Sequence, residues 1–197
     1  MIDIRRFVNW LDWRTTSLDQ NELIVIVVTG PVGSGKSTTA WALHDMLIAE
    51  RIPTALIDMD FLRCAWPQVT AWNHQLGYDN FAAIAVNHQA IGVRCFVVAD
   101  VVESLEQRAD YESAVPGARV VIVRLDVPLD VIEARLRVRE TAESIEWFLA
   151  RAPELQEILT RNGIGDLVVK VDGHSGAEVA KEIFDRLELG SRWRLPE

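Results

Sequence analysis

Residues 23–38 read LIVIVVTGPVGSGKST, and this stretch decides the fold. Its second half has the spacing of a phosphate-binding loop: a glycine, four free positions, then Gly35, Lys36 and Ser37. Its first half, residues 23–28, is apolar and rich in β-branched side chains, as is typical of a strand buried on both faces. The stretch therefore predicts a strand, a phosphate-binding loop and a helix in succession.

The residue types in this loop suit the chemistry of phosphate binding. Glycines let the backbone bend tightly, so that successive N–H groups converge on phosphate oxygens. A helix that begins near Lys36 adds the positive end of its dipole. We expect Lys36 to reach the β- and γ-phosphates and Ser37 to ligate Mg²⁺. The alternative, a glycine-rich turn without a ligand, fits the strand and helix context less well. The predicted nucleotide-binding residues are Gly30, Pro31, Val32, Gly33, Ser34, Gly35, Lys36, Ser37 and Thr38.

The composition is that of an ordinary globular domain. The chain has 197 residues, of which 49% are hydrophobic and 25% charged. Its net charge of −9 argues against a general nucleic-acid binder, which would present a basic face. No stretch approaches the apolar length of a membrane span, and the N-terminus lacks the apolar core of a signal peptide. These features predict a cytoplasmic protein with neither nucleic-acid nor membrane partners, in a compartment that supplies ATP.

Apolar runs alternate with segments of helical periodicity along most of the chain, which predicts an α/β fold. Parallel strands joined by helices form a sheet that is covered on both faces. We divide the chain into a helical N-terminal extension (1–22), one main domain (23–190) and an irregular tail (191–197). The predicted strands are 23–29, 53–58, 94–99, 119–125 and 166–171. The predicted helices are 36–50, 79–92, 103–114, 128–140, 142–161 and 176–188, and residues 60–78 form a broken segment.

Acidic side chains stand where two of these strands end. Asp58 and Asp60 follow the second strand, and period-two alternation places both on one side if the strand runs through them. Asp100 follows the third strand. Such acids can hold Mg²⁺ near Ser37, or orient and deprotonate an acceptor hydroxyl. The alternative is that they cap the helices that follow.

Arginines gather near the helix that Pro128 opens. Arg135 and Arg139 are four residues apart and share a helix face, and Arg151 follows in the next helical stretch. Arginines on a mobile lid commonly stabilise a transferring phosphoryl group. The alternative is a solvated helix face whose charge is balanced by neighbouring glutamates. We predict a small helical lid at about residues 135–160.

Three segments together resemble the small P-loop kinases, such as adenylylsulfate, gluconate and shikimate kinases and chloramphenicol phosphotransferase. They are the phosphate-binding loop, the pattern Asp58-x-Asp60-x-x-Arg63, and residues 123–139 (VRLDVPLDVIEARLRVR). The resemblance implies the P-loop NTP hydrolase fold, a five-stranded parallel sheet with helices on both faces. It also implies that Asp60 is the base or the residue that orients the acceptor, that Asp58 lies on the Mg²⁺ side and that Arg63 binds substrate. The loop at 172–174 would pass the adenine.

The chain departs from this resemblance in one place. Adenylylsulfate kinases usually follow the paired acids with Asn and then Arg, whereas Phe61 and Leu62 intervene here, which weakens adenylylsulfate as a substrate. The aromatic residues that follow match no substrate signature. We assign Tyr78, Phe81 and Trp72 to the core and leave Trp66 open between core and ring stacking.

These patterns predict an ATP- and Mg²⁺-dependent kinase that phosphorylates a hydroxyl of a small molecule. The predicted catalytic residues are Lys36, Asp60, Arg135 and Arg139; Asp60, Arg63 and Asp100 would bind the acceptor, and Ser37 and Asp58 the metal. The alternative is a regulatory nucleotide-binding NTPase without an acceptor. The guanine-reading Asn-Lys-x-Asp string of GTPases and the Leu-Ser-Gly-Gly signature of ABC ATPases do not occur. The chain is expected to be a monomer or a homodimer.

Overall fold

A computed structural model describes residues 22–192 of the chain. The predicted N-terminal helical extension lies outside the described residues, as do residues 193–197. Within the described range no helix has both the length and the apolar character needed to cross a membrane.

The centre of the fold is one parallel sheet with the strand order β2-β3-β1-β4-β5. The central strand β1 pairs with β3 on one side and β4 on the other. Every residue of β1 from Ile24 to Thr29 is buried, which explains why its sequence is continuously apolar instead of alternating. The strands are β1 (Leu23–Thr29), β2 (Thr54–Asp58), β3 (Cys95–Ala99), β4 (Ala118–Asp126) and β5 (Leu167–Lys170).

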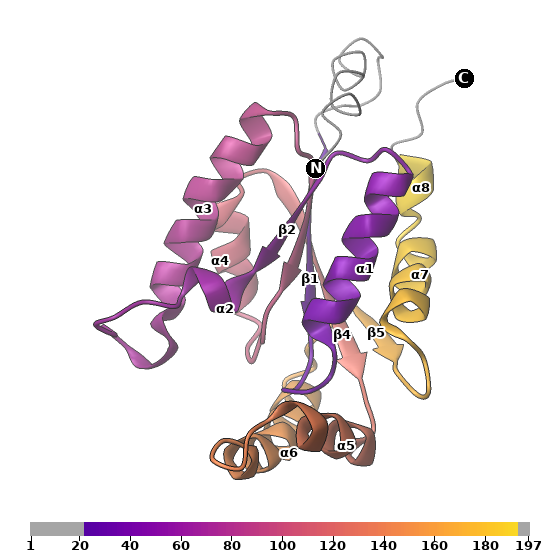
Figure 1. Ribbon diagram of the computed structural model, residues 1–197. Helices are drawn as coiled ribbons and strands as arrows, with labels where there is room; N and C mark the ends of the chain where they lie inside the picture. Colours follow the sequence, from indigo (N-terminus) through magenta and orange to yellow (C-terminus); the bar gives the residue numbers. More distant parts are fainter. Residues whose placement is uncertain (1–21, 193–197) are drawn as a thin grey trace, which may run out of the picture.

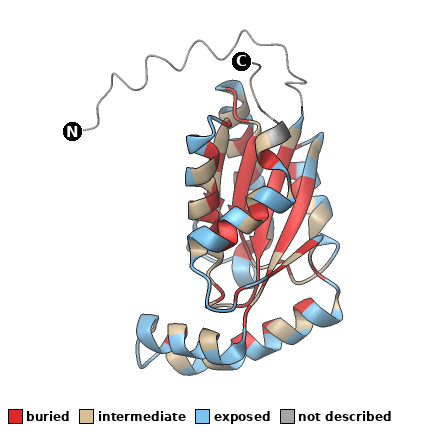
Figure 2. Cartoon of the chain, turned by 90° about the vertical axis from the view of Figure 1, so that its right-hand side faces the viewer, coloured by how far each residue is buried: buried red, intermediate tan, exposed pale blue. Residues whose placement is uncertain are grey.

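Helices cover both faces of this sheet, which confirms the predicted fold class (Figure 1). On one face, α1 (Lys36–Ala49) packs against α7 (Gly176–Arg186), and α8 (Leu189–Arg192) follows. On the other face, α3 (His74–Ala90) packs against α4 (Gln107–Ala114). Each face has its own apolar core, and the buried strands run between the two cores (Figure 2).

The remaining helices lie near the carboxyl ends of the strands. The pair α5 (Leu129–Arg139) and α6 (Ile145–Arg161) sits beyond that edge of the sheet, where the lid was predicted (Figure 1). The short helix α2 (Met59–Leu62) directly follows β2, and the 3-10 helix η2 (Ala71–Asn73) directly precedes α3. The connection after β1 crosses one face and the connection after β3 crosses the other, so the strand order switches between β1 and β3, and open α/β sheets commonly bind ligands at such a switch.

The structure corrects four local predictions. Strand β2 ends at Asp58, whose side chain accepts a hydrogen bond from the Asp60 backbone N–H and caps α2, so the strand does not run through both acids. Helix α3 begins at His74 and not at residue 79. Trp72 is exposed, whereas Tyr78 and Phe81 are buried as predicted. The end of the main domain is helical as far as residue 192, where an irregular tail was expected from residue 191.

Candidate active site

The phosphate-binding loop joins β1 to α1 at the centre of the carboxyl edge. Gly35 adopts a left-handed conformation (φ 95°) directly before the first residue of α1, where a side chain would be strained. Gly33 also has positive φ (79°), and a Cβ there would lie 3.0 Å from Leu136 Cγ of α5. Gly35 is therefore required by its backbone conformation. Gly33 is required both by its conformation and by the close packing of α5.

Lys36 folds back over the loop. Its Nζ donates hydrogen bonds to the carbonyl oxygens of Gly30, at 3.2 Å, and Pro31, at 3.1 Å. Burial lowers the pKa of Lys36 to about 8, and the nearby carboxylate of Asp60 opposes this shift. The ammonium group is therefore partly deprotonated in slightly alkaline solution, and it lies within electrostatic reach of the acids that follow β2.

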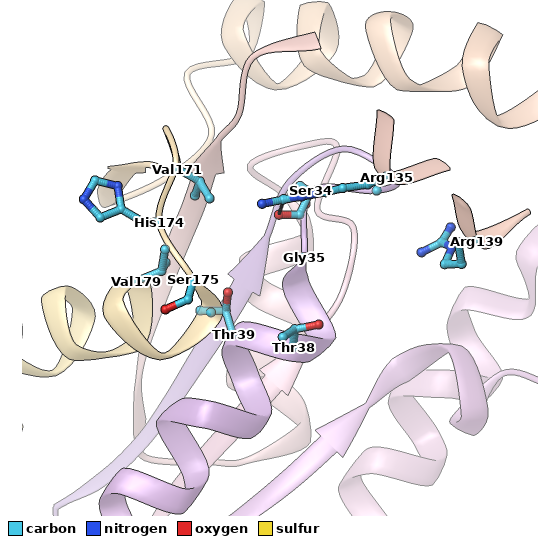
Figure 3. Close-up of a pocket in the computed structure, with 12 residues that line it drawn as sticks. Ser34, Gly35, Thr38, Thr39, Arg135, Arg139, Val171, His174, Ser175 and Val179 are labelled. Carbon is cyan, nitrogen blue, oxygen red and sulfur yellow. Dashed lines mark hydrogen bonds between the residues drawn. The ribbon is translucent and has the colours of Figure 1, made fainter. Parts of the chain in front are cut away.

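A cavity of about 280 Å³ opens beside the loop (Figure 3). The loop and the start of α1 form one wall, and Arg135 and Arg139 of the lid form another. The third wall comes from the end of β5 and the start of α7, where Val171 and Val179 provide apolar surface. The lining residues are Gly33, Ser34, Gly35, Thr38, Thr39, Arg135, Arg139, Val171, His174, Ser175, Gly176 and Val179.

One polar atom of this cavity has no internal partner. The Oγ of Ser34 is buried and makes no hydrogen bond within the part of the chain that the structure describes. Leaving a buried hydroxyl unpaired is costly, and such atoms often mark a ligand position. An anion in the loop would satisfy this hydroxyl, so the observation fits the predicted phosphate site.

Two oxygen-bearing side chains that were predicted to bind Mg²⁺ meet at the other side of the loop. The Ser37 hydroxyl donates to Asp58 Oδ2 at 2.9 Å, so the first turn of α1 and the end of β2 are in direct contact. Mg²⁺ in nucleotide sites uses one or two protein oxygens together with phosphates and waters. Ser37 and Asp58 supply such a pair of oxygens, and the described residues contain no cluster of three or more acidic, histidine or cysteine side chains.

Asp60 stands next to this pair with an exposed carboxylate. Its backbone N–H donates to Asp58 Oδ1 at 3.1 Å, which fixes the start of α2. Among the described residues its carboxylate has no hydrogen-bond or ion-pair partner, and it is the acid that acts most strongly on the pKa of Lys36. A free carboxylate close to the phosphate-binding lysine can accept a proton from an incoming hydroxyl.

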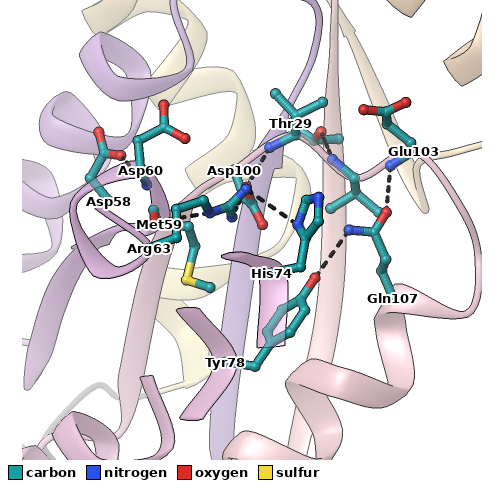
Figure 4. Close-up of polar contacts among 12 residues, drawn as sticks. Thr29, Asp58, Met59, Asp60, Arg63, His74, Tyr78, Asp100, Glu103 and Gln107 are labelled. Atoms are coloured by element: carbon teal, nitrogen blue, oxygen red, sulfur yellow. Dashed lines mark hydrogen bonds and ion pairs between the residues drawn. The ribbon is translucent and has the colours of Figure 1, made fainter. Parts of the chain in front are cut away.

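Arg63 and Asp100, both predicted to bind substrate, bind each other instead (Figure 4). Arg63 Nη2 lies 2.5 Å from Asp100 Oδ1, and the Asp100 side chain has no exposed surface. The Tyr111 hydroxyl donates to the other carboxylate oxygen, and the Val101 N–H donates to Oδ1. Burial raises the pKa of Asp100, while the Arg63 guanidinium opposes that shift. Asp100 is thus enclosed, in contrast to the predicted contact with substrate.

The arginines of the lid divide into two groups. Arg135 donates to the Ser34 carbonyl at 3.1 Å, has no carboxylate partner among residues 22–192, and lines the cavity together with Arg139. Arg139 pairs with Glu140. Arg151 is held by Glu103 and Glu154 and does not line the cavity. The structure brings Arg135 and Arg139, but not Arg151, to the predicted nucleotide position.

Sequence reasoning missed several residues of the site. Tyr111 closes the buried network around Asp100, and no motif marks it; its only signal is a place on the buried face of a predicted helix. Val171 and Val179 were not predicted to line the cavity. The sequence signal for this wall was the loop at residues 172–174, which was predicted to pass the adenine. His174 of that loop lines the cavity.

Solved structures of similar fold are P-loop kinases and related proteins. The tunicamycin resistance protein of Deinococcus radiodurans superposes with a TM-score of 0.61 at 18% identity, covering 84% of this chain and 96% of that one. The APS kinase of Mycobacterium tuberculosis, solved with AMPPNP and APS, gives 0.57 at 24% identity, covering 85% and 98%. The shikimate kinase of Acinetobacter baumannii, solved with shikimate, gives 0.53 at 17%, covering 87% and 96%.

The fold is therefore that of the small P-loop kinases, which confirms the resemblance that the three sequence segments indicated. Residues 25–155 match the AAA domain family, and the chain belongs to that family. None of the curated proteins compared with this chain matches it.

The depressed pKa of Lys36 leads to a prediction about pH. Phosphate raises the pKa of a lysine beside it, so nucleotide binding above pH 8 must take up a proton. We expect the affinity for ADP to be nearly constant below about pH 7 and to fall by up to about tenfold per unit as the pH rises through the free-enzyme pKa of about 8. Calorimetric titration from about pH 6.5 to about pH 9.5 measures this slope.

A Lys36→Arg variant is the control, because arginine stays charged throughout this range. Its ADP affinity should show no such slope. Unchanged affinity of the wild-type protein up to about pH 9.5 would contradict the assignment of Lys36.

Proposed function

We propose that this chain is an ATP-dependent kinase that transfers the γ-phosphoryl group to a hydroxyl of a small molecule. The observation that carries the proposal is the arrangement around the loop: Ser37 bonded to Asp58, and Asp60 beside them with a free carboxylate. A carboxylate in this position can orient an acceptor hydroxyl and take its proton. The AAA domain match and the kinase fold support the same function.

The residues divide the work of the reaction. The loop amides and the Ser34 hydroxyl hold the phosphates, and Lys36 neutralises their charge. The cavity beside His174 accepts the adenine ring. Ser37 and Asp58 would hold Mg²⁺, which supplies charge neutralisation when bound. Arg135 and Arg139 stabilise the charge on the transferring group. The acceptor oxygen bonds to the γ-phosphorus as the bond to the β–γ bridging oxygen breaks, ADP leaves, and the acceptor proton passes to Asp60.

The function is tested by coupling ADP release to a library of hydroxylated metabolites. The expected result is ADP release that depends on one acceptor class and yields one phosphorylated product per ADP. ATP hydrolysis that no acceptor accelerates would contradict the proposal and favour a regulatory NTPase.

Asp60→Asn tests the predicted base. The amide cannot take the acceptor proton, so transfer should fall by at least about a hundredfold while ATP affinity changes little. Asp79→Asn is the matched control, because Asp79 is an exposed acid on α3 that bonds to Gln75. An Asp60→Asn protein with full transfer activity would remove Asp60 from the mechanism.

A further inference from the structure

The wall of the site beyond Asp58 and Asp60 offers no free positive charge. Arg63 is the only lysine or arginine in residues 58–80. Its side chain is only 10% exposed and is paired with the fully buried Asp100. Its charge is neutralised inside the protein, so it is not available to an anionic substrate.

The neighbouring loop after β3 offers no free positive charge either. Residues 100–106 contain three acids and no lysine or arginine. Arg151 of the lid reaches this loop, but Glu103, at 2.6 Å, and Glu154, at 2.8 Å, already hold it. A carboxylate, sulfate or phosphate on the acceptor would therefore find no unpaired lysine or arginine in these two segments, whereas an uncharged molecule needs none.

A row of aromatic rings connects this wall to the nucleotide cavity. The rings of Trp72 and Trp147 lie 5.9 Å apart at 40°, and Phe148 lies 4.8 Å from Trp147. The guanidinium of Arg139 sits 5.5 Å from the centre of the Phe148 ring. Because Arg139 also lines the cavity, the row runs from the predicted phosphate position to the segment between α2 and α3.

These rings are exposed, and yet the segment that bears Trp72 is fixed. Trp72 is 53% exposed and Trp147 47%, and Phe61 and Trp66 of the same wall are also exposed. The buried Asn73 accepts hydrogen bonds from the N–H groups of Val69 and Thr70 and donates to the Arg63 carbonyl. Exposed apolar surface held on a fixed loop beside a polar site marks a binding surface.

We propose that the phosphoryl acceptor is an alcohol that carries a flat ring and no negative charge. Its ring packs on the Trp72–Trp147 pair, and its hydroxyl points toward Asp60. Aromatic faces bind flat rings of many kinds by stacking, and this wall offers an anion no unpaired lysine or arginine. This inference rests on the proposed kinase function and names the substrate class of that site.

Paired compounds that differ in one property test the inference. The charge pair is 4-(hydroxymethyl)benzoate and its uncharged methyl ester; the ring pair is methyl riboside and uridine. We expect kcat/KM to be higher for the methyl ester and for uridine, each by at least about tenfold. Preference for the anionic member, or equal use of methyl riboside and uridine, would overturn the inference and leave the kinase proposal standing.

Variants of the two tryptophans locate the effect. Trp72→Ala and Trp147→Ala should raise the KM for the ring-bearing acceptor by about tenfold and leave the KM for ATP unchanged. Trp41→Ala is the matched control, because Trp41 is an exposed tryptophan of α1, on the other face of the sheet from α3. Equal effects of all three substitutions would overturn the assignment of the ring site.

A binding measurement separates the two proposals. Calorimetry with uridine, in the presence of a non-hydrolysable ATP analogue, reports the ring site without turnover. Saturable binding that Trp72→Ala weakens, together with no transfer to any compound, would support the ring site and contradict the kinase function. Neither binding nor transfer would overturn both.

Discussion

Lys36→Ala should lower phosphoryl transfer by about 10³-fold or more and leave the protein folded. The ammonium group lies against the carbonyls of Gly30 and Pro31, at the loop that is expected to hold the β- and γ-phosphates. Without it, the charge that develops on the transferring group loses its closest cation from the loop. ADP release with a working acceptor measures the loss, and circular dichroism with a thermal melt checks the fold.

Lys181→Ala is the matched control for this substitution. Lys181 pairs with Asp185 on the exposed side of α7, far along the chain from the loop. Its removal should change neither transfer nor ATP affinity. Retained phosphoryl transfer by a well-folded Lys36→Ala protein would contradict the proposed mechanism.

Arg63→Met should destabilise the fold by about 3–5 kcal/mol. The substitution leaves the fully buried carboxylate of Asp100 without its cation, although Tyr111 and the Val101 N–H still donate to it. Urea denaturation followed by fluorescence gives the free energy of unfolding. Arg137→Met is the control, since it breaks an exposed ion pair with Glu133 and should cost about 0.3–0.5 kcal/mol.

The destabilisation of Arg63→Met should depend on pH. Burial already raises the pKa of Asp100 in the wild-type protein, and loss of Arg63 removes the main group that opposes this rise. A carboxyl group whose pKa is raised by folding destabilises the native state only at pH values above its unfolded pKa, about 3.9. The difference from wild type should shrink as the pH falls toward that value. A loss below about 1 kcal/mol at neutral pH would contradict the buried ion pair.

The sequence was enough to predict the layers of the fold, because the two central strands β1 and β3 are almost unbroken apolar runs. Residues 23–29 and 95–99 are buried almost throughout, and only a sheet covered on both faces gives this pattern. Boundaries were predicted less well where polar side chains decide them. Asn73 and Asp58 end or begin elements through side-chain hydrogen bonds, which a periodicity argument does not contain.

The candidate site was likewise predicted well where its chemistry is local and poorly where it depends on contacts between distant residues. The loop from Gly30 to Thr38 is predicted by spacing because its chemistry is local. The partners of Arg63 depend on contacts between residues 37 positions apart, which only the folded chain brings together. The sequence predicted that Arg63 binds substrate, whereas in the structure Arg63 forms an ion pair with the buried Asp100.

The packing of Leu136 against Gly33 has a mechanical consequence. Leu136 of α5 rests on the phosphate-binding loop, and Arg135 donates a hydrogen bond to the Ser34 carbonyl. The second half of α5 is therefore held against the loop. A side chain at position 33 would therefore press on α5 as well as strain the backbone of the loop.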